Sequence, residues 1–87
     1  MHTAQIAQAP LTAASLEEWL VTKISSVSGI KPEQIDTTQP FADFGLDSVT
    51  LVGLSGELEE LLGKSLSPTV VYDYPNIEAL AHHLSKK

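Results

Sequence analysis

Apolar residues recur at intervals of three and four over two long segments of the chain, the spacing of one face of an α-helix. In the first segment they are Leu16, Leu20, Ile24 and Val27, with Trp19 beside them. Ser15 and Glu18 form the S-x-x-E pattern of a capping box, and Gly29 follows a serine-rich stretch. We therefore predict a first helix that begins at Ser15 and stops at Gly29.

A second helix is predicted from Ser48 to Leu62, with Asp47 or Ser48 as its N-cap and Gly63 as its stop. Its leucines fall within one arc of about 100°: Leu51, Leu54, Leu58, Leu61 and Leu62. Roughly opposite are Val49 and Val52, beside Gly53, Gly56 and Glu60. A glycine inside a helix costs about 1 kcal/mol relative to Ala. This second face is either a docking surface that a partner approaches closely or a place where one valine packs on another helix.

The remaining segments predict a long loop and two further helices. Residues 30–44 should form a loop that Ile35, Phe41 and Phe44 hold to the core. Ser67 and Pro68 predict the start of a short third helix over residues 70–72. Asn76 should cap a fourth helix, whose apolar positions are Ile77, Leu80, Ala81 and Leu84. The predicted fold is all-α: a four-helix bundle with a short third helix and a long loop between helices 1 and 2.

The chain of 87 residues can form one small core but no deep cleft between two domains. Residues 1–14 have no helical period and no charged side chain, so we expect a flexible leader. Residues 15–85 are then the folded domain, and residues 86–87 are a C-terminal tail. We see no signal peptide and no apolar run of about 18 residues that could cross a membrane. The absence of cysteine fits a reducing cytoplasm.

Charge is unevenly distributed and gives a net charge of −6. Between Lys31 and Lys64 there are seven acidic residues and no Lys or Arg. This acidic centre argues against nucleic acid and anionic membranes as partners and favours basic proteins. The alternative is that the acids serve only solubility. We expect a monomer.

Few residues offer catalytic chemistry. Without cysteine there is no disulfide, thiolate metal site or thiol nucleophile from the chain itself. Ser48 lacks the second glycine of a nucleophile elbow. His82 and His83 would point about 100° apart on a helix, so we expect them to be solvated rather than to share a site. The sequence therefore predicts neither an enzyme nor a metal site.

Ser48 is the one serine in a distinctive place, at the predicted start of the second helix after the long loop. It either caps that helix or carries a modification. A phosphodiester there would lie near unpaired helix N–H groups and the positive end of the helix dipole.

The residues around Ser48 resemble a known family. Residues 43–49, with the sequence DFGLDSV, resemble the attachment motif of acyl carrier proteins. Residues 66–81, LSPTVVYDYPNIEALA, resemble the region of helices three and four in carriers of the polyketide-synthase type. Pro40 and Phe41 at the end of the long loop also match. The resemblance covers about residues 15–85.

This resemblance implies that a phosphopantetheinyl transferase, with Mg²⁺ on the transferase, attaches 4'-phosphopantetheine from coenzyme A to Ser48. The thiol of that arm would hold an acyl group as a thioester, and the protein itself would catalyse nothing. Asp47 would orient the serine for the transferase. The residues presented to partners would be Val49, Val52, Gly53, Gly56, Glu57 and Glu60. Those partners would include an acyl-loading enzyme and downstream ketosynthase or tailoring enzymes.

Some features leave the cargo open. Many carriers place acids early in the second helix, whereas here they cluster at Glu57, Glu59 and Glu60. Residues 19–21 and 54–59 are similar to carriers that accept fatty acids from fatty acyl-AMP ligases. One alternative is a peptidyl carrier for an amino acid. Another is a helical protein-interaction module in which Ser48 is only a cap. The chain is either a freestanding carrier or an excised domain.

Overall fold

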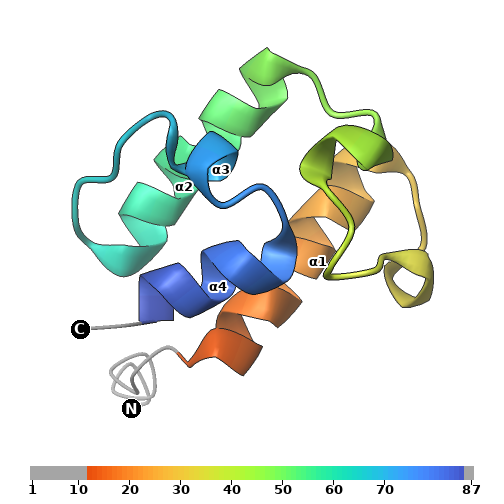
Figure 1. Cartoon of the computed structure of the whole chain (residues 1–87), viewed down its shortest axis with the longest axis horizontal. Coiled ribbons are helices and arrows are strands. Elements are labelled where there is room, and N and C mark those ends of the chain that lie inside the picture. Colours follow the sequence, from red (N-terminus) through yellow and green to blue (C-terminus); the bar gives the residue numbers. More distant parts are fainter. Residues whose placement is uncertain (1–11, 86–87) are drawn as a thin grey trace, which may run out of the picture.

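Four α-helices and two short 3₁₀ turns form the part of the chain that the computed structural model describes, residues 12–85. The helices are α1 (Ala13–Ser28), α2 (Ser48–Leu62), α3 (Val70–Asp73) and α4 (Ile77–Ser85) (Figure 1). The turns η2 (Pro32–Gln34) and η3 (Phe41–Phe44) lie in the long loop between α1 and α2. No β-strand forms within these residues. The predicted all-α bundle with a short third helix is therefore confirmed.

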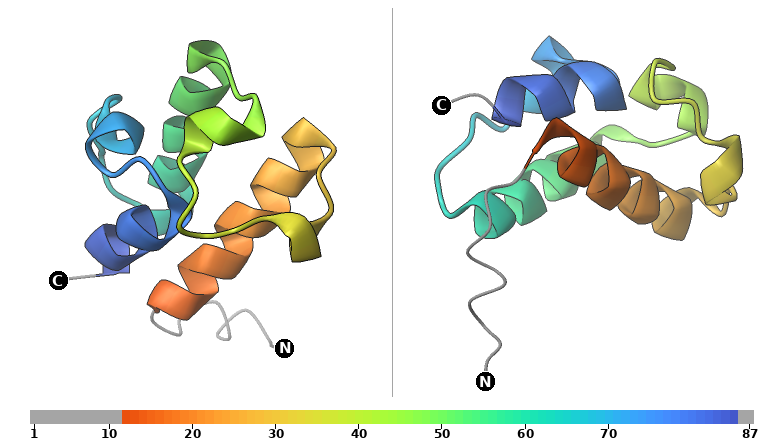
Figure 2. Two further views of the ribbon diagram at one scale, coloured as in Figure 1. Left: turned by 45° about the vertical axis from the view of Figure 1, so that its right-hand side comes forward. Right: turned by 90° about the horizontal axis from the view of Figure 1, so that it is seen from below.

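The helices pack in two pairs around one apolar core. The long helix α1 packs mainly on α4, and α2 packs on α3. Figures 1 and 2 show α4 against α1 and α3 beside α2. Every helix contributes side chains to the core, including Leu16, Leu20, Leu58, Val71 and Leu80. No helix among residues 12–85 is both long enough and apolar enough to span a membrane.

The first helix begins two residues earlier than predicted. Thr12 is the N-cap, and its Oγ1 accepts a hydrogen bond of 3.1 Å from the backbone N–H of Ser15. Ser15 is therefore already inside the helix, and the predicted capping box of Ser15 and Glu18 does not form. A cap at Thr12 lengthens the helix by Ala13 and Ala14, and alanine is a favourable helix residue. Residues 1–11 of the predicted leader and the 86–87 tail lie outside the described residues.

Two residues predicted for the core are exposed instead. Val27 of α1 is 58% exposed and Leu61 of α2 is 38% exposed. Both keep the helical spacing, but they lie at helix ends, where no neighbouring element covers them. The other core leucines of α2, Leu51, Leu54 and Leu58, are buried, and Leu62 is partly buried.

The third helix, Val70–Asp73, contains the predicted residues 70–72, but its N-cap is Thr69 and not Ser67. Ser67 instead makes a local turn, in which its Oγ accepts from the N–H of Thr69 at 3.2 Å and its carbonyl accepts from Val70 at 3.0 Å. The fourth helix begins as predicted. The side chain of Asn76 accepts from the N–H of Ala79 at 2.7 Å.

The long loop is attached to the start of α4. The N–H of Phe41 donates to the carbonyl of Pro75 at 2.8 Å, and that of Glu78 donates to Thr37 at 2.9 Å. The predicted anchors Ile35, Phe41 and Phe44 are all buried. These contacts fix the end of the loop immediately before Ser48, and they therefore position the start of α2.

Candidate functional site

Ser48 is the first residue of α2, and its side chain is exposed. The chain reaches it through Gly45, which adopts a left-handed conformation with φ of 76° after η3. Glycine adopts this conformation readily, and it allows the sharp change of direction between η3 and α2. Among residues 12–85, the Ser48 hydroxyl takes part in no side-chain hydrogen bond. The hydroxyl is thus open to solvent and to a reaction partner.

The N-cap of α2 is Asp47, which settles the choice between Asp47 and Ser48. The Oδ1 of Asp47 accepts from the N–H of Thr50 at 2.8 Å. This backbone hydrogen bond, with a smaller contribution from the Thr50 side chain, lowers the pKa of Asp47 from its usual value of 3.8. Asp47 is therefore a charged cap at neutral pH, and Ser48 is free of that structural task.

The start of α2 fits a phosphodiester on Ser48. The carboxylate of Asp47 accepts a hydrogen bond from the N–H of Thr50, and its carbonyl accepts one from the N–H of Leu51. The N–H groups of Ser48 and Val49 precede the first intrahelical bond and have no partner within the helix. Unpaired N–H groups and the helix dipole favour an anion at this position.

The outward face of α2 carries exposed apolar and small residues. Val49 is 78% exposed and Val52 is 46% exposed, so both valines can be reached from solvent. Gly56 and Glu60 are exposed on the same side of the helix. A Cβ atom built on Gly53 or Gly56 would meet no atom within 4 Å, so packing inside the protein does not require glycine at either position.

Glu57 and Gly53 lie at a different place from the rest of the predicted docking residues. Both line a pocket between α2 and α1. Glu57 forms an ion pair with Lys23 of α1, and the Lys23 Nζ lies 5.6 Å from the centre of the Trp19 ring. The sequence gives no sign of this pairing, because the partners are 34 positions apart and belong to different helices.

Glu59 has a structural contact that sequence reasoning missed. Its carboxylate accepts a hydrogen bond of 2.8 Å from the N–H of Leu66, which fixes the turn after α2. This carboxylate oxygen is therefore less available for a contact with a partner protein. Among the three acids at positions 57, 59 and 60, Glu60 is the one that best fits the predicted docking face, because it is exposed.

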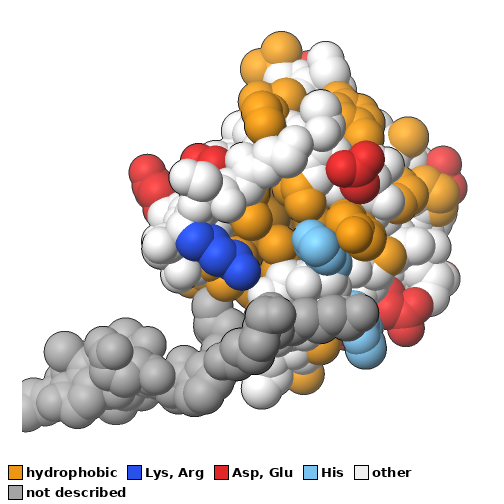
Figure 3. Space-filling model, turned by 60° about the vertical axis from the view of Figure 1, so that its left-hand side comes forward, with side chains coloured by type: hydrophobic (Ala, Val, Ile, Leu, Met, Phe, Trp, Pro, Cys, Tyr) orange, Lys and Arg blue, Asp and Glu red, His pale blue; other side chains and the backbone are white. Residues whose placement is uncertain are grey.

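The two histidines of α4 are exposed, as predicted, but one of them also packs on an aromatic ring. His83 stacks on Tyr74 with ring centres 4.0 Å apart and an angle of 13° between the planes. Figure 3 shows histidine side chains beside hydrophobic ones on this side of the molecule, with acidic side chains at several separate places on the same face. This stacking joins α4 to the segment that follows α3.

The chain is similar to carrier proteins in sequence and in structure. Residues 18–84 match the family described as "Phosphopantetheine attachment site". Polyketide synthase PksL of Bacillus subtilis is 36% identical over 70 residues, which are 80% of this chain but 2% of that protein. Acyl carrier protein TtuC of Teredinibacter turnerae is 32% identical over 87 residues, 100% of both chains.

Solved structures agree with this assignment. A free-standing peptidyl carrier protein from an uncharacterized secondary metabolic pathway of Acinetobacter baumannii has a TM-score of 0.78 and 38% identity. The matched region is 84% of this chain and 91% of that one. The family match, the shared helical fold and the full-length relative together show that this chain belongs to the phosphopantetheine-binding carrier proteins, which hold their cargo on a 4'-phosphopantetheine arm and are not themselves catalysts.

Proposed function

We propose that this protein carries acyl groups as thioesters on 4'-phosphopantetheine attached to Ser48, and that it delivers them to enzymes of polyketide or fatty-acid type. The observation that carries this proposal is the exposed Ser48 hydroxyl at the start of α2, beside N–H groups without intrahelical partners. It lies within the residues that match the carrier family.

Attachment requires one phosphoryl transfer, which a transferase catalyses. The Ser48 oxygen attacks a phosphorus atom of coenzyme A, its proton passes to a base on the transferase, and the nucleotide half of coenzyme A leaves. The product is a phosphodiester. When bound, the arm supplies a thiol, which this cysteine-free chain lacks. Asp47 supports the reaction by holding the first turn of α2 in place, so that Ser48 is presented in one orientation.

The proposed partner face is the exposed side of α2. Val49, Val52, Gly56 and Glu60 provide apolar contact, close approach and negative charge for a basic partner. Gly53 and Glu57 form the edge of this face toward α1. Its users would be the phosphopantetheinyl transferase, a loading enzyme such as a fatty acyl-AMP ligase, and a ketosynthase or tailoring enzyme.

An amino acid is the second candidate cargo. The similarity to a free-standing peptidyl carrier protein favours it. The similarity to an acyl carrier protein over 100% of both chains favours the acyl group. Incubation of the phosphopantetheinylated protein with fatty acyl-AMP ligases and with amino-acid-activating adenylation enzymes, followed by intact-mass measurement, decides between them.

Mass spectrometry tests the attachment site directly. We expect the wild-type protein, incubated with coenzyme A, Mg²⁺ and a broad-specificity transferase, to gain the mass of one phosphopantetheine. Ser48→Ala should gain none and should remain folded, because Asp47 and not Ser48 caps α2. Ser65→Ala, at another exposed serine, is the control and should be modified normally. Addition of the arm to Ser48→Ala would refute the proposed site.

A further inference from the structure

The aromatic stack of Tyr74 and His83 holds the junction between α3 and α4. Tyr74 is the C-cap of α3, and His83 lies in the last turn of α4. Their ring centres are 4.0 Å apart, with 13° between the ring planes. Side chains on an α-helix lean toward its N-terminal end, so the His83 ring extends back toward the residues that precede α4. The stack therefore connects α4 to the linker of residues 74–76.

The position of Tyr74 is well defined in this linker. Its N–H donates to the carbonyl of Val70 at 3.0 Å, and its side chain is partly buried against the core. The proline that follows disfavours a helical conformation for Tyr74, which has φ of −128° and ψ of 81°. His83 is itself exposed and packs on the tyrosine ring from outside. A contact with Tyr74 thus also acts on the backbone of Pro75.

Pro75 in turn holds the segment that leads to Ser48. Its carbonyl accepts the hydrogen bond of 2.8 Å from the N–H of Phe41, the first residue of η3. Next to this bond, Pro40 and Asn76 form an antiparallel β-bridge. From Phe41 the chain passes through η3 and reaches Ser48 seven positions later. Movement of the linker would therefore be transmitted to the start of α2.

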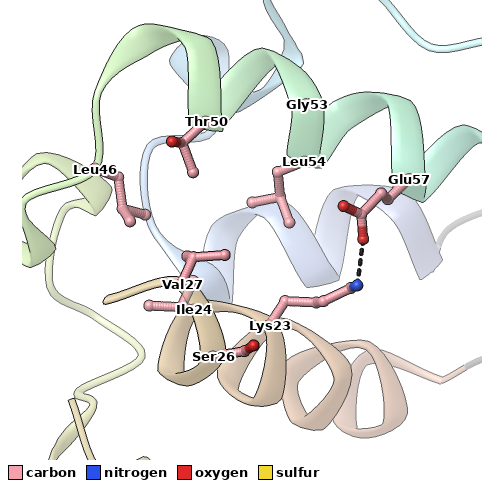
Figure 4. A pocket seen from close by; sticks show the side chains of 9 residues that line it. All are labelled: Lys23, Ile24, Ser26, Val27, Leu46, Thr50, Gly53, Leu54 and Glu57. Carbon is pink, nitrogen blue, oxygen red and sulfur yellow. Dashed lines mark ion pairs between the residues drawn. The ribbon is translucent and has the colours of Figure 1, made fainter. Parts of the chain in front are cut away.

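The start of α2 has little support from α1. Leu46 and Thr50, on either side of Ser48 in the sequence, line a pocket between the two helices (Figure 4). The ion pair of Lys23 and Glu57 joins these helices nine positions after the serine. The orientation of Ser48 consequently depends on the Asp47 cap and on the loop that Pro75 holds.

We propose that His83 is a positioning residue for attachment of phosphopantetheine to Ser48, and that it acts through Tyr74, Pro75 and Phe41. The inference rests on the proposed function and adds to it a residue 35 positions from the serine in the sequence. Loss of the imidazole ring frees the tyrosine ring and weakens the hydrogen bond of Phe41 to Pro75. The Ser48 hydroxyl then samples more orientations, and fewer of them suit the transferase.

The test compares three substitutions of His83 with one of its neighbour. His83→Phe keeps a flat ring for the stack, whereas His83→Ala and His83→Gln remove it. Alanine and glutamine favour a helix at least as well as histidine does, so a weaker α4 would not account for a loss. His82→Ala is the matched control, because His82 is also exposed and, among residues 12–85, takes part in no aromatic stack.

Amide hydrogen exchange at Phe41 measures its hydrogen bond to Pro75 directly. We expect this exchange to be roughly threefold to tenfold faster in His83→Ala and His83→Gln, as loss of one aromatic pair implies. Exchange inside α2, at Leu58, should not change.

Kinetics of phosphopantetheine transfer give the second measurement. The kcat should fall by about twofold to fivefold in the two variants without a ring, because fewer bound molecules present Ser48 correctly. The KM for the carrier should stay the same, since the exposed face of α2 is intact. His83→Phe and His82→Ala should match the wild type in exchange and in kinetics.

The outcomes distinguish this inference from the proposed function. A wild-type protein that gains no phosphopantetheine would contradict the proposed function. Normal kcat in His83→Ala, with or without faster exchange at Phe41, would overturn the positioning role alone. Equal losses in His83→Phe and His83→Ala would also overturn it, because the stacked ring would then not matter. A lower kcat accompanied by faster exchange at Leu58 would assign the effect to loss of the whole fold, and circular dichroism of each variant checks for that loss.

Discussion

At the start of α2, two neighbouring residues have different tasks. Asp47 accepts the N–H of Thr50 and holds the helix end, which leaves the Ser48 hydroxyl exposed. The cap can therefore be changed without removing the reactive group, and the reactive group can be changed without removing the cap. Mutations at the two positions should have separable effects on stability and on modification.

Substitution of Asp47 tests this separation. Asp47→Asn keeps a capping oxygen, so we expect a small change in melting temperature at pH 7, whereas Asp47→Ala should lower it by a few degrees. If Asp47 also orients the serine for the transferase, Asp47→Asn should still slow phosphopantetheine transfer. Thermal unfolding and transfer kinetics on the same preparations provide the comparison. Normal transfer to a stable Asp47→Asn protein would restrict the role of Asp47 to capping.

The Asp47 carboxylate also predicts a pH dependence. Hydrogen bonding lowers its pKa below 3.8 in the folded state, so the charged form contributes stability above the unfolded pKa. That contribution should be lost as pH falls through the lower, folded value. The stability difference between the wild type and Asp47→Asn should therefore be constant from pH 5 to pH 7 and shrink below about pH 3.8. Chemical unfolding of both proteins at a series of pH values tests this. A stability difference that stays constant below about pH 3.8 would contradict the prediction.

Single-residue predictions succeed where the pattern along one helix suffices. The exposure of Val49 and Val52 follows from their angle to the leucines of α2, and the structure agrees. The predicted burial of Val27 is wrong because no neighbouring element covers this side chain, which is 58% exposed. The roles of Glu57 and Glu59 depend on Lys23 and Leu66, which no helical period relates to them.

Among the elements, helix interiors are predicted more securely than helix ends. Gly29 and Gly63 end α1 and α2 in left-handed conformations, with φ of 80° and 70°, where glycine is favoured. The first residue of a helix is harder to predict. Thr12 and Ser15 are both residue types that cap helices well, and the sequence alone does not show which of them is the N-cap. The same ambiguity applies to α3, whose N-cap is Thr69 and not the predicted Ser67.

The capping of α1 can be tested with two alanine variants. Thr12→Ala removes the side-chain acceptor for the Ser15 N–H, and we expect it to destabilise the protein by about 1 kcal/mol. Ser15→Ala lies inside the helix and should change stability by only a few tenths of a kcal/mol. Urea unfolding followed by circular dichroism gives both values. A larger loss in Ser15→Ala would restore the capping box that the sequence predicts.

Over the whole molecule, the net charge of −6 is expected to act mainly on encounter with partners. Glu60 lies on the proposed partner face, and Glu33 lies in η2 of the long loop; both are exposed. Glu60→Lys and Glu33→Lys change net charge equally, so position alone distinguishes them. We expect Glu60→Lys to slow transferase modification several-fold at low salt and much less at 0.5 M salt. Equal effects of the two reversals would indicate that net charge, and not this face, governs the encounter.

The hydrogen bonds that join the long loop to the start of α4 have a consequence for synthesis. Phe41 and Thr37 precede Ser48, yet their partners Pro75 and Glu78 are made about 30 residues after it. A chain emerging from the ribosome thus exposes its serine well before the contacts that position the serine can close. Modification during translation would have to wait until the last helix has emerged, which links the moment of cofactor attachment to completion of the fold.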